Sequence, residues 1–196
     1  ELYEEVILPV GAVEMEEDKA AYQKIKAIGF SSIEDYYSLP IRKNQKGISV
    51  DFGDHYTGDL EFTIASTIAA HAPLRLKVKF AEVPAEMAAS FQDYKGSLSQ
   101  AWLQEEILTI HTFPATIKLT NRYAFRYVQF EVLACAYDMD FILSDIKAFA
   151  RSSAGADRLA DAVSLNDNFQ AINDISLKTL KECMQTVFED GPKRDR

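Results

Sequence analysis

The stretch Leu74-Arg75-Leu76-Lys77-Val78-Lys79-Phe80 shows the clearest alternation of apolar and charged side chains in the chain. Successive side chains of a β-strand point to opposite faces of the sheet. The pattern therefore predicts a strand with one face in an apolar core and the other in water. A strand of this kind is stable only beside other strands, so partner strands are expected elsewhere in the sequence.

Alternation of the same kind occurs before and after this stretch. Residues 48–52 and 60–64 alternate in this way, and the polar residues 54–58 between them predict a short loop joining two strands. Further strands are predicted at 106–110, 114–119, 124–134 and about 140–149. Pro114 is typical of an edge strand or a strand start. Together these strands predict a mainly β protein with an antiparallel, jelly-roll-like β-sandwich.

The N-terminal residues follow a different pattern. The apolar run at 6–10 predicts a first strand, and apolar residues at helical spacing predict a helix from about 14 to Gly29. Ser32, followed by two acidic residues, predicts a second short helix that ends before Pro40. We therefore expect a lead-in with short helices at residues 1–46.

The C-terminal residues predict a long amphipathic helix at about 165–188, capped by Asn166 or Asp167 and ended by Gly191 and Pro192. One amphipathic helix cannot bury its apolar face by itself. It either packs on the sandwich or begins a further helical domain, and we favour the second. The charged run Asp190-Gly191-Pro192-Lys193-Arg194-Asp195-Arg196 follows this helix.

Composition limits the possible partners. The 196 residues are 47% hydrophobic and carry a net charge of −9, with no basic stripe. This charge disfavours nucleic acid and anionic membranes as partners. Cys135 and Cys183 are too few for a disulfide scaffold or a zinc cluster, so buried free thiols are expected. The compartment stays open between periplasm, cytoplasm and extracellular space.

Four segments resemble the bacterial α-L-rhamnosidases, glycoside hydrolase family 78. The run Asp190–Asp195 is similar to a loop of the form Asp-x-Pro-x-Arg-Glu in that family, and residues 177–185 resemble the helix before it. The segments 50–62 and 121–131 are similar to the start and end of the β-sandwich that precedes the family's (α/α)6-barrel catalytic domain. The resemblance implies a sandwich accessory domain at 47–151, a linker at 152–164, and the first barrel helix with its active-site loop at 165–196.

The resemblance also implies roles for three residues. Asp190 matches a carboxylate that binds rhamnose hydroxyls, and Arg194 matches the arginine before the catalytic acid. Asp195 matches the general acid of an inverting mechanism, with Asp in place of the Glu of the best-known members. The family's Trp, second Asp and catalytic base are expected beyond Arg196. We therefore expect the parent protein to hydrolyse rhamnosides without a cofactor, and this chain alone to be inactive.

Several other side chains are possible functional groups. Three separated histidines follow no metal-ligand spacing, which favours structural or surface roles. Aromatic residues are either a sugar-stacking face or core, with core the commoner role; they are Tyr36, Tyr37, Tyr56, Tyr94 and Trp102. Glu82, Glu105 and Glu106 are expected to be solvated rather than an acid/base pair. The alternative function is a non-catalytic carbohydrate-binding or scaffolding sandwich.

Overall fold

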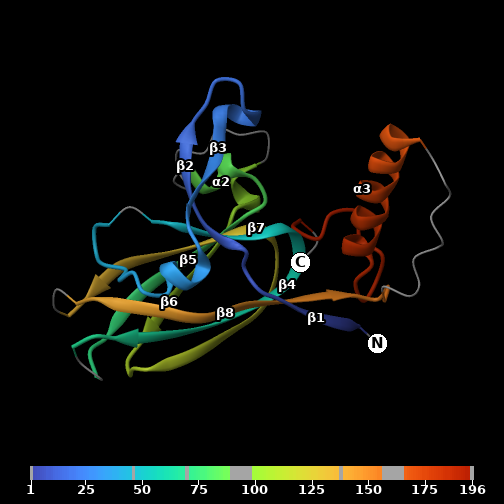
Figure 1. Ribbon diagram of the computed structural model, residues 1–196. Coiled ribbons are helices and arrows are strands. Elements are labelled where there is room, and N and C mark those ends of the chain that lie inside the picture. Colours follow the sequence, from blue (N-terminus) through green and yellow to red (C-terminus); the bar gives the residue numbers. More distant parts are fainter. Residues whose placement is uncertain are drawn as a thin grey trace.

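The computed structural model describes residues 2–45, 47–68, 71–88, 99–136, 139–155 and 166–194. The strands are β1 (Tyr3–Ile7), β2 (Gly11–Glu17), β3 (Ile25–Ser31), β4 (Ser49–Ser66), β5 (Leu74–Ala81), β6 (Gln104–Ile110), β7 (Ala115–Cys135) and β8 (Phe141–Ser152). The helices are α1 (Ile33–Tyr36), α2 (Pro84–Ala88) and α3 (Asp167–Cys183), with 3-10 turns at Tyr22–Lys24 and Gln100–Trp102. The predicted mainly β, antiparallel fold is confirmed (Figure 1).

The sheet has the strand order β1-β8-β4-β7-β5-β6, and β2 joins it beside β4 and carries β3 on its other edge. The long strands β4 and β7 run through both halves of this sheet. Residues 115–129 of β7 pair with β4, and residues 127–135 pair with β5. The late part of β4 pairs with β8, and its first residues pair with β2. The sheet thereby folds over itself, as in a sandwich whose two layers share strands.

One apolar core lies between the two halves. The rings of Phe62 on β4 and Phe130 on β7 meet edge to face, with centroids 4.9 Å apart. Phe80 on β5 stacks on Tyr123 of β7 at 3.9 Å. All four side chains are almost completely buried, so burial of aromatic surface is a main source of stability in this fold.

The predicted loop at 54–58 is wrong, because β4 continues through it. The pairing register with β7 shifts between Asp51 and Tyr56, which marks a bulge rather than a chain reversal. Gly53 adopts a φ of +79°, which favours glycine, and its N–H donates to the Asp51 carboxylate at 2.7 Å. Arg126 of β7 holds the same carboxylate with two hydrogen bonds. The polar residues therefore bend one strand instead of ending it.

The alternating stretch at 74–80 lies in β5, and its apolar face is fully buried as predicted. Lys79 is an exception on the charged face, because it is also buried. Helix α2 covers this position, and the Lys79 ammonium donates to the Met87 carbonyl at 3.3 Å. Burial lowers the pKa of the Lys79 ammonium from its ordinary value.

The helix predicted from about 14 to Gly29 is wrong. These residues form the β2–β3 hairpin, in which Glu14 pairs with Ile28 and Met15 with Ala27. Alternation decides the outcome here, since Val13, Met15 and Ala27 pack with Met87 of α2 in a small second core. The short helix predicted after Ser32 is confirmed. It is α1, and the Ser32 side chain caps it by accepting a hydrogen bond from the Asp35 N–H.

Helix α3 begins as predicted, with the Asn166 side chain capping the Phe169 N–H. It ends at Cys183, however, so the prediction that Gly191 and Pro192 end the helix is wrong. The chain turns back instead through a bridge between Met184 and Phe188. Hydrogen bonds from Ser152 and Ser153 at the end of β8 fix this turn by binding the Met184 carbonyl. The segment after α3 then returns to the sheet (Figure 1).

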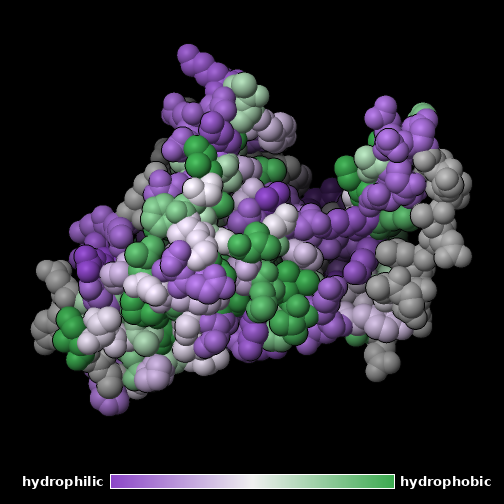
Figure 2. Space-filling view, in the orientation of Figure 1, coloured by the Kyte–Doolittle hydropathy of each residue, from purple (hydrophilic) through white to green (hydrophobic). Residues whose placement is uncertain are grey.

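The side chains of α3 are only partly covered by the sheet. Phe169, Ile172 and Ile175 are each at least 60% exposed, and hydrophobic patches are visible on α3 in Figure 2. Within the described ranges, no helix has the length and apolar character to cross a membrane. Cys183 is buried at the end of α3, Cys135 is half-buried, and no disulfide joins them.

Candidate functional site

The terminal loop brings two of the three predicted site residues together. Asp190 and Arg194 lie four residues apart and form an ion pair between carboxylate and guanidinium. A hydrogen bond of 2.9 Å from the Arg194 N–H to the Gly191 carbonyl closes the turn between them. The side chains of Asp190 and Arg194 are 73% and 45% exposed. Asp195, the predicted acid, lies outside the described residues.

Two buried residues of the loop bind the β-domain, and we call Glu189 and Lys193 the anchor residues. The Glu189 carboxylate accepts a hydrogen bond of 2.7 Å from Arg122 on β7. The Lys193 ammonium donates to Glu86 of α2 at 2.6 Å and to Glu82 at 3.2 Å. Each anchor residue directly precedes a predicted site residue, Asp190 or Arg194. The loop is therefore fixed to the sheet on both sides of its turn.

The acceptor of Lys193 is itself held in place. Glu86 is fully buried, and its second oxygen accepts the Glu82 N–H at 2.9 Å. The Glu82 carboxylate also contacts the ring of His55 on β4, at 3.0 Å. Burial acts to raise the pKa of the Glu82 carboxyl, but the His55 hydrogen bond and the charge of Lys193 together hold it below the ordinary value. Glu82 is therefore held as the ionised partner of Lys193.

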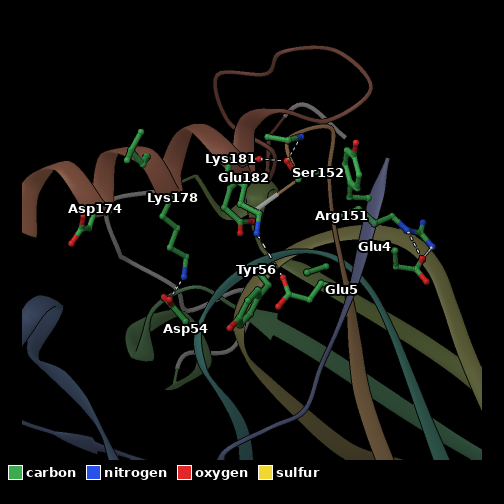
Figure 3. Close-up of a pocket in the computed structure, with 15 residues that line it drawn as sticks. Glu4, Glu5, Asp54, Tyr56, Arg151, Ser152, Asp174, Lys178, Lys181 and Glu182 are labelled. Atoms are coloured by element: carbon green, nitrogen blue, oxygen red, sulfur yellow. Dashed lines mark hydrogen bonds and ion pairs between the residues drawn. The ribbon is translucent and has the colours of Figure 1, made fainter. Parts of the chain in front are cut away.

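A cleft of about 720 Å³ lies between α3 and the edge of the sheet formed by β1 and β8. Figure 3 shows charged side chains meeting across it. Lys178 of α3 pairs with Asp54, and Lys181 with Glu5 at 3.7 Å. Burial raises the pKa of the Glu182 carboxyl, which also lines this cleft. Asp190 and Arg194 are not among the residues that line this cleft. The ion pairs across the cleft hold α3 against the sheet.

Tyr36, Tyr37 and Tyr56, three of the aromatic candidates in the described part of the chain, do not share one sugar-stacking face. Tyr36 is in the core, and the Tyr37 hydroxyl accepts the Ile146 N–H at 3.1 Å. Tyr56 lines the cleft, but the Lys178 ammonium lies 5.1 Å from its ring centroid and covers one face (Figure 3). Tyr94 lies outside the described residues. Packing, a hydrogen bond and a cation–π contact therefore account for Tyr36, Tyr37 and Tyr56.

Glu82 and Glu106, which were expected to be solvated, each take part in specific side-chain contacts. Glu82 belongs to the Lys193 contacts, whereas Glu106 of β6 accepts from Asn121 and the Tyr123 hydroxyl. The two do not form an acid/base pair. Arg122, Glu86 and the anchor residues were missed, because an ion pair between residues far apart in sequence leaves no local pattern. Among the described residues, no group of three or more His, Cys, Asp or Glu side chains is placed to hold a metal ion.

Comparison with protein families shows the class of protein to which the chain belongs. Residues 9–150 match a model of an N-terminal domain of glycosyl hydrolases. The model is that of the glycosyl hydrolase family 78 alpha-rhamnosidase N-terminal domain, and the chain belongs to this family.

Solved structures agree with this family. The whole chain matches a rhamnosidase from Klebsiella oxytoca with rhamnose bound, at 35% identity and a TM-score of 0.90, and it covers 38% of that chain. A family 78 rhamnosidase of Bacillus sp. GL1 is 14% identical, with a TM-score of 0.57 over 86% of this chain and 17% of its own, which is a likeness of fold alone. No match was found among curated proteins.

Proposed function

We propose that this chain is the N-terminal β-domain, first helix and sugar-binding loop of an inverting α-L-rhamnosidase. The observation that carries the proposal is the Klebsiella rhamnosidase, which was solved with rhamnose bound and is similar to this chain over its whole length, terminal loop included. The family match over residues 9–150 supports a glycosidase as the parent protein. We expect terminal α-L-rhamnose of plant or bacterial glycans to be the substrate.

Asp190 and Arg194 are proposed to bind the sugar. Sugar hydroxyls donate hydrogen bonds, and an ionised carboxylate such as Asp190 only accepts them. The pairing of Arg194 with Asp190 supports this role, because a charge-assisted contact fixes the carboxylate in one orientation. Both side chains are substantially exposed, so we expect the remaining walls of the sugar site to come from further residues of the parent protein.

Asp195 is proposed to be the general acid. Its carboxyl proton passes to the glycosidic oxygen as the bond from that oxygen to the anomeric carbon breaks. A water molecule adds to the anomeric carbon from the opposite face and gives its proton to a carboxylate base outside this chain. In inverting enzymes the two carboxyl groups stand about 6.5–9.5 Å apart, which leaves room for the water. Because the base is outside it, the 196-residue chain alone is expected to be inactive.

Helix α3 is proposed to begin the helical domain of the parent. The support is its exposed apolar face, which includes Phe169, Ile172 and Ile175. If α3 instead packed its apolar face on the β-sheet of this chain, these side chains would be buried.

The test is hydrolysis of an aryl α-L-rhamnoside by the parent protein, with the product anomer followed by NMR. We expect β-L-rhamnose as the first product, as inversion requires. Asp195→Asn is expected to lower turnover by about 10²–10⁴-fold, the usual contribution of a general acid, while sugar binding is retained. A folded parent that releases no rhamnose would contradict the proposed function and favour the non-catalytic alternative. Near wild-type turnover of Asp195→Asn would remove that residue from the acid role.

A further inference from the structure

Arg122 lies in a bulge of β7. On β4 the pairing passes from Leu60 to Gly58, a step of two residues. On β7 the same step runs from Leu119 to Tyr123 and covers four residues, so β7 carries two extra residues at this place. A bulge interrupts the regular alternation and turns a side chain in a new direction, and bulges are common beside functional sites. The bulge therefore decides where Arg122 points.

The Arg122 guanidinium reaches from this bulge to the terminal loop. It donates a hydrogen bond of 2.7 Å to the carboxylate of Glu189, which lies 67 positions later in the chain. The Glu189 side chain is 7% exposed and that of Arg122 is 24% exposed. A hydrogen bond between opposite charges is short and strong, and salt screens it little where water is excluded. The contact therefore fixes the Glu189 carboxylate relative to β7.

The backbone of Glu189 is held as well as its side chain. Its N–H donates to the carbonyl of Cys183, the last residue of α3, at 2.9 Å. Glu189 is therefore tied to α3 through its backbone and to β7 through its carboxylate. The next residue, Asp190, has a side chain that is 73% exposed. A fixed, buried residue directly before an exposed one gives the exposed side chain a rigid base.

We propose that Arg122, acting through Glu189, is a positioning residue that holds the carboxylate of Asp190 in place for sugar binding. The proposal rests on the proposed function, in which Asp190 accepts hydrogen bonds from rhamnose. It gives the N-terminal β-domain a part in substrate recognition, because β7 supplies the group that fixes the loop. Neither Arg122 nor Glu189 needs to contact the sugar for this role.

Removal of Arg122 has a definite physical consequence. The buried Glu189 carboxylate loses its cation, which is a costly state. The carboxylate lowers this cost by turning toward water, and it then moves the backbone that it shares with Asp190. A hydrogen bond weakens steeply when its distance and angle change. Because loss of one hydrogen bond to a charged group weakens binding by about tenfold or more, rhamnose should bind less tightly.

The experiment measures the dissociation constant of L-rhamnose from the full-length parent by titration calorimetry. The test variants are Arg122→Met and Glu189→Ala, which both remove the contact. Glu189→Gln is the conservative rescue, because its side-chain carbonyl still accepts a hydrogen bond from Arg122. Arg126→Met is the matched control. Arg126 lies on the same strand and also holds a largely buried carboxylate, that of Asp51 at 2.8 Å, but this pair joins β7 to β4 rather than to the terminal loop.

A double-mutant cycle tests whether Arg122 acts through Asp190. Asp190→Asn is expected to weaken rhamnose binding itself, because a neutral amide replaces a charged acceptor. If Arg122 acts only through Asp190, then Arg122→Met adds little in the Asp190→Asn background, and the two changes are non-additive. A variant that is merely less stable lowers the number of binding sites per chain and leaves the affinity of the folded molecules unchanged.

We expect the dissociation constant to rise about tenfold in Arg122→Met and Glu189→Ala. The rescue and the control are expected to stay within about threefold of the wild type. Wild-type affinity in Glu189→Ala would overturn the inference, even if Arg122→Met failed to fold, and so would full additivity in the cycle. A wild-type parent that does not bind L-rhamnose, or an Asp190→Asn variant with wild-type affinity, would refute the proposed function instead, so the two failures are distinguishable.

Discussion

The contact between Lys193 and Glu86 gives a prediction for the stability of the 196-residue chain itself. In Lys193→Met the Glu86 carboxylate keeps one hydrogen bond, from the Glu82 N–H, but loses its nearest cation. The Glu86 side chain is 0% exposed and that of Lys193 is 8% exposed, so the contact belongs with buried ion pairs. Removing one member of such a pair costs about 3–5 kcal/mol, because an uncompensated charge stays buried.

This cost has a direct readout in the melting temperature. For a domain of this size, 1 kcal/mol shifts the midpoint by about 2–4 °C, so Lys193→Met is expected to lower it by about 6–20 °C. Circular dichroism at pH 7, in 0.15 M and in 1 M NaCl, measures the shift. Salt screens an exposed pair much more than a buried one, so we expect the shift to persist at high salt.

Two variants make the interpretation specific. The double variant Lys193→Met/Glu86→Gln is expected to recover most of the loss, because no fully buried charge is then left unpaired, and Glu82, which also loses Lys193, is partly exposed and keeps its contact with His55. Lys147→Met removes an ammonium that is 33% exposed, and is expected to cost about 1 kcal/mol or less. A loss below about 1 kcal/mol in Lys193→Met, or one that disappears in 1 M NaCl, would refute a buried pair at this position.

Further perturbations test other parts of the structure. The Glu82 carboxyl has a pKa below its ordinary value of 4.5 in the folded chain, so it stabilises the fold above that pH and less as pH falls through the lowered pKa. The stability gap between wild type and Glu82→Gln, followed by urea denaturation, should therefore shrink as pH falls below about 4.5. Gly58→Ala would place a Cβ 2.0 Å from the Phe149 carbonyl oxygen, which forces β4 and β8 apart and should lower the melting temperature strongly, whereas Gly29→Ala meets nothing within 4 Å and should leave it nearly unchanged; equal melting temperatures would contradict the close approach of β4 and β8 at Gly58. Ile175 is 69% exposed, so Ile175→Glu should change the stability of this chain by about 0.5 kcal/mol or less and destabilise the parent far more; equal small effects in both would count against a helical domain over α3.

The strands were predictable where one face is buried and the other is wet. In β5 the apolar side chains Leu74, Leu76 and Val78 have zero exposure, and alternation identified them directly. The same rule fails at Lys79, because helix α2, which follows β5 after a short turn, folds back over the charged face. The alternation shows which residues of β5 are apolar, but it does not show where the next helix packs, and that packing buries Lys79.

Bends and turns were less predictable than strands. The polar run after Asp51 has the composition of a loop, and only the pairing with β7 on both sides of the bulge shows that β4 continues. Residues 14–29 satisfy a helical spacing and a strand alternation at once. The strand pairing wins there because β2 finds a partner in β4, which supplies the hydrogen bonds that a lone segment lacks.

The candidate site was predictable only as a motif. Asp190 and Arg194 were identified by resemblance to a family, and the structure brings their side chains together. The residues that fix them, Lys193 and Glu86, carry charges of the kind that most often lie on a solvated surface. Only their burial distinguishes them, and burial of a charge is decided by its distant partner.

The pairing of β1 with β8 has a consequence for the synthesis of the protein on the ribosome. Tyr3 lies opposite Ser152, so β1 pairs with a strand that the ribosome makes about 150 residues later. At a synthesis rate of about 5–20 residues per second, this interval lasts roughly 7–30 s. Throughout it, the nascent β1 segment has an open hydrogen-bonding edge and lacks the strand that it pairs with in the folded sheet. The emerging chain therefore exposes an unpaired strand edge, a template for pairing with other chains, until β8 leaves the exit tunnel.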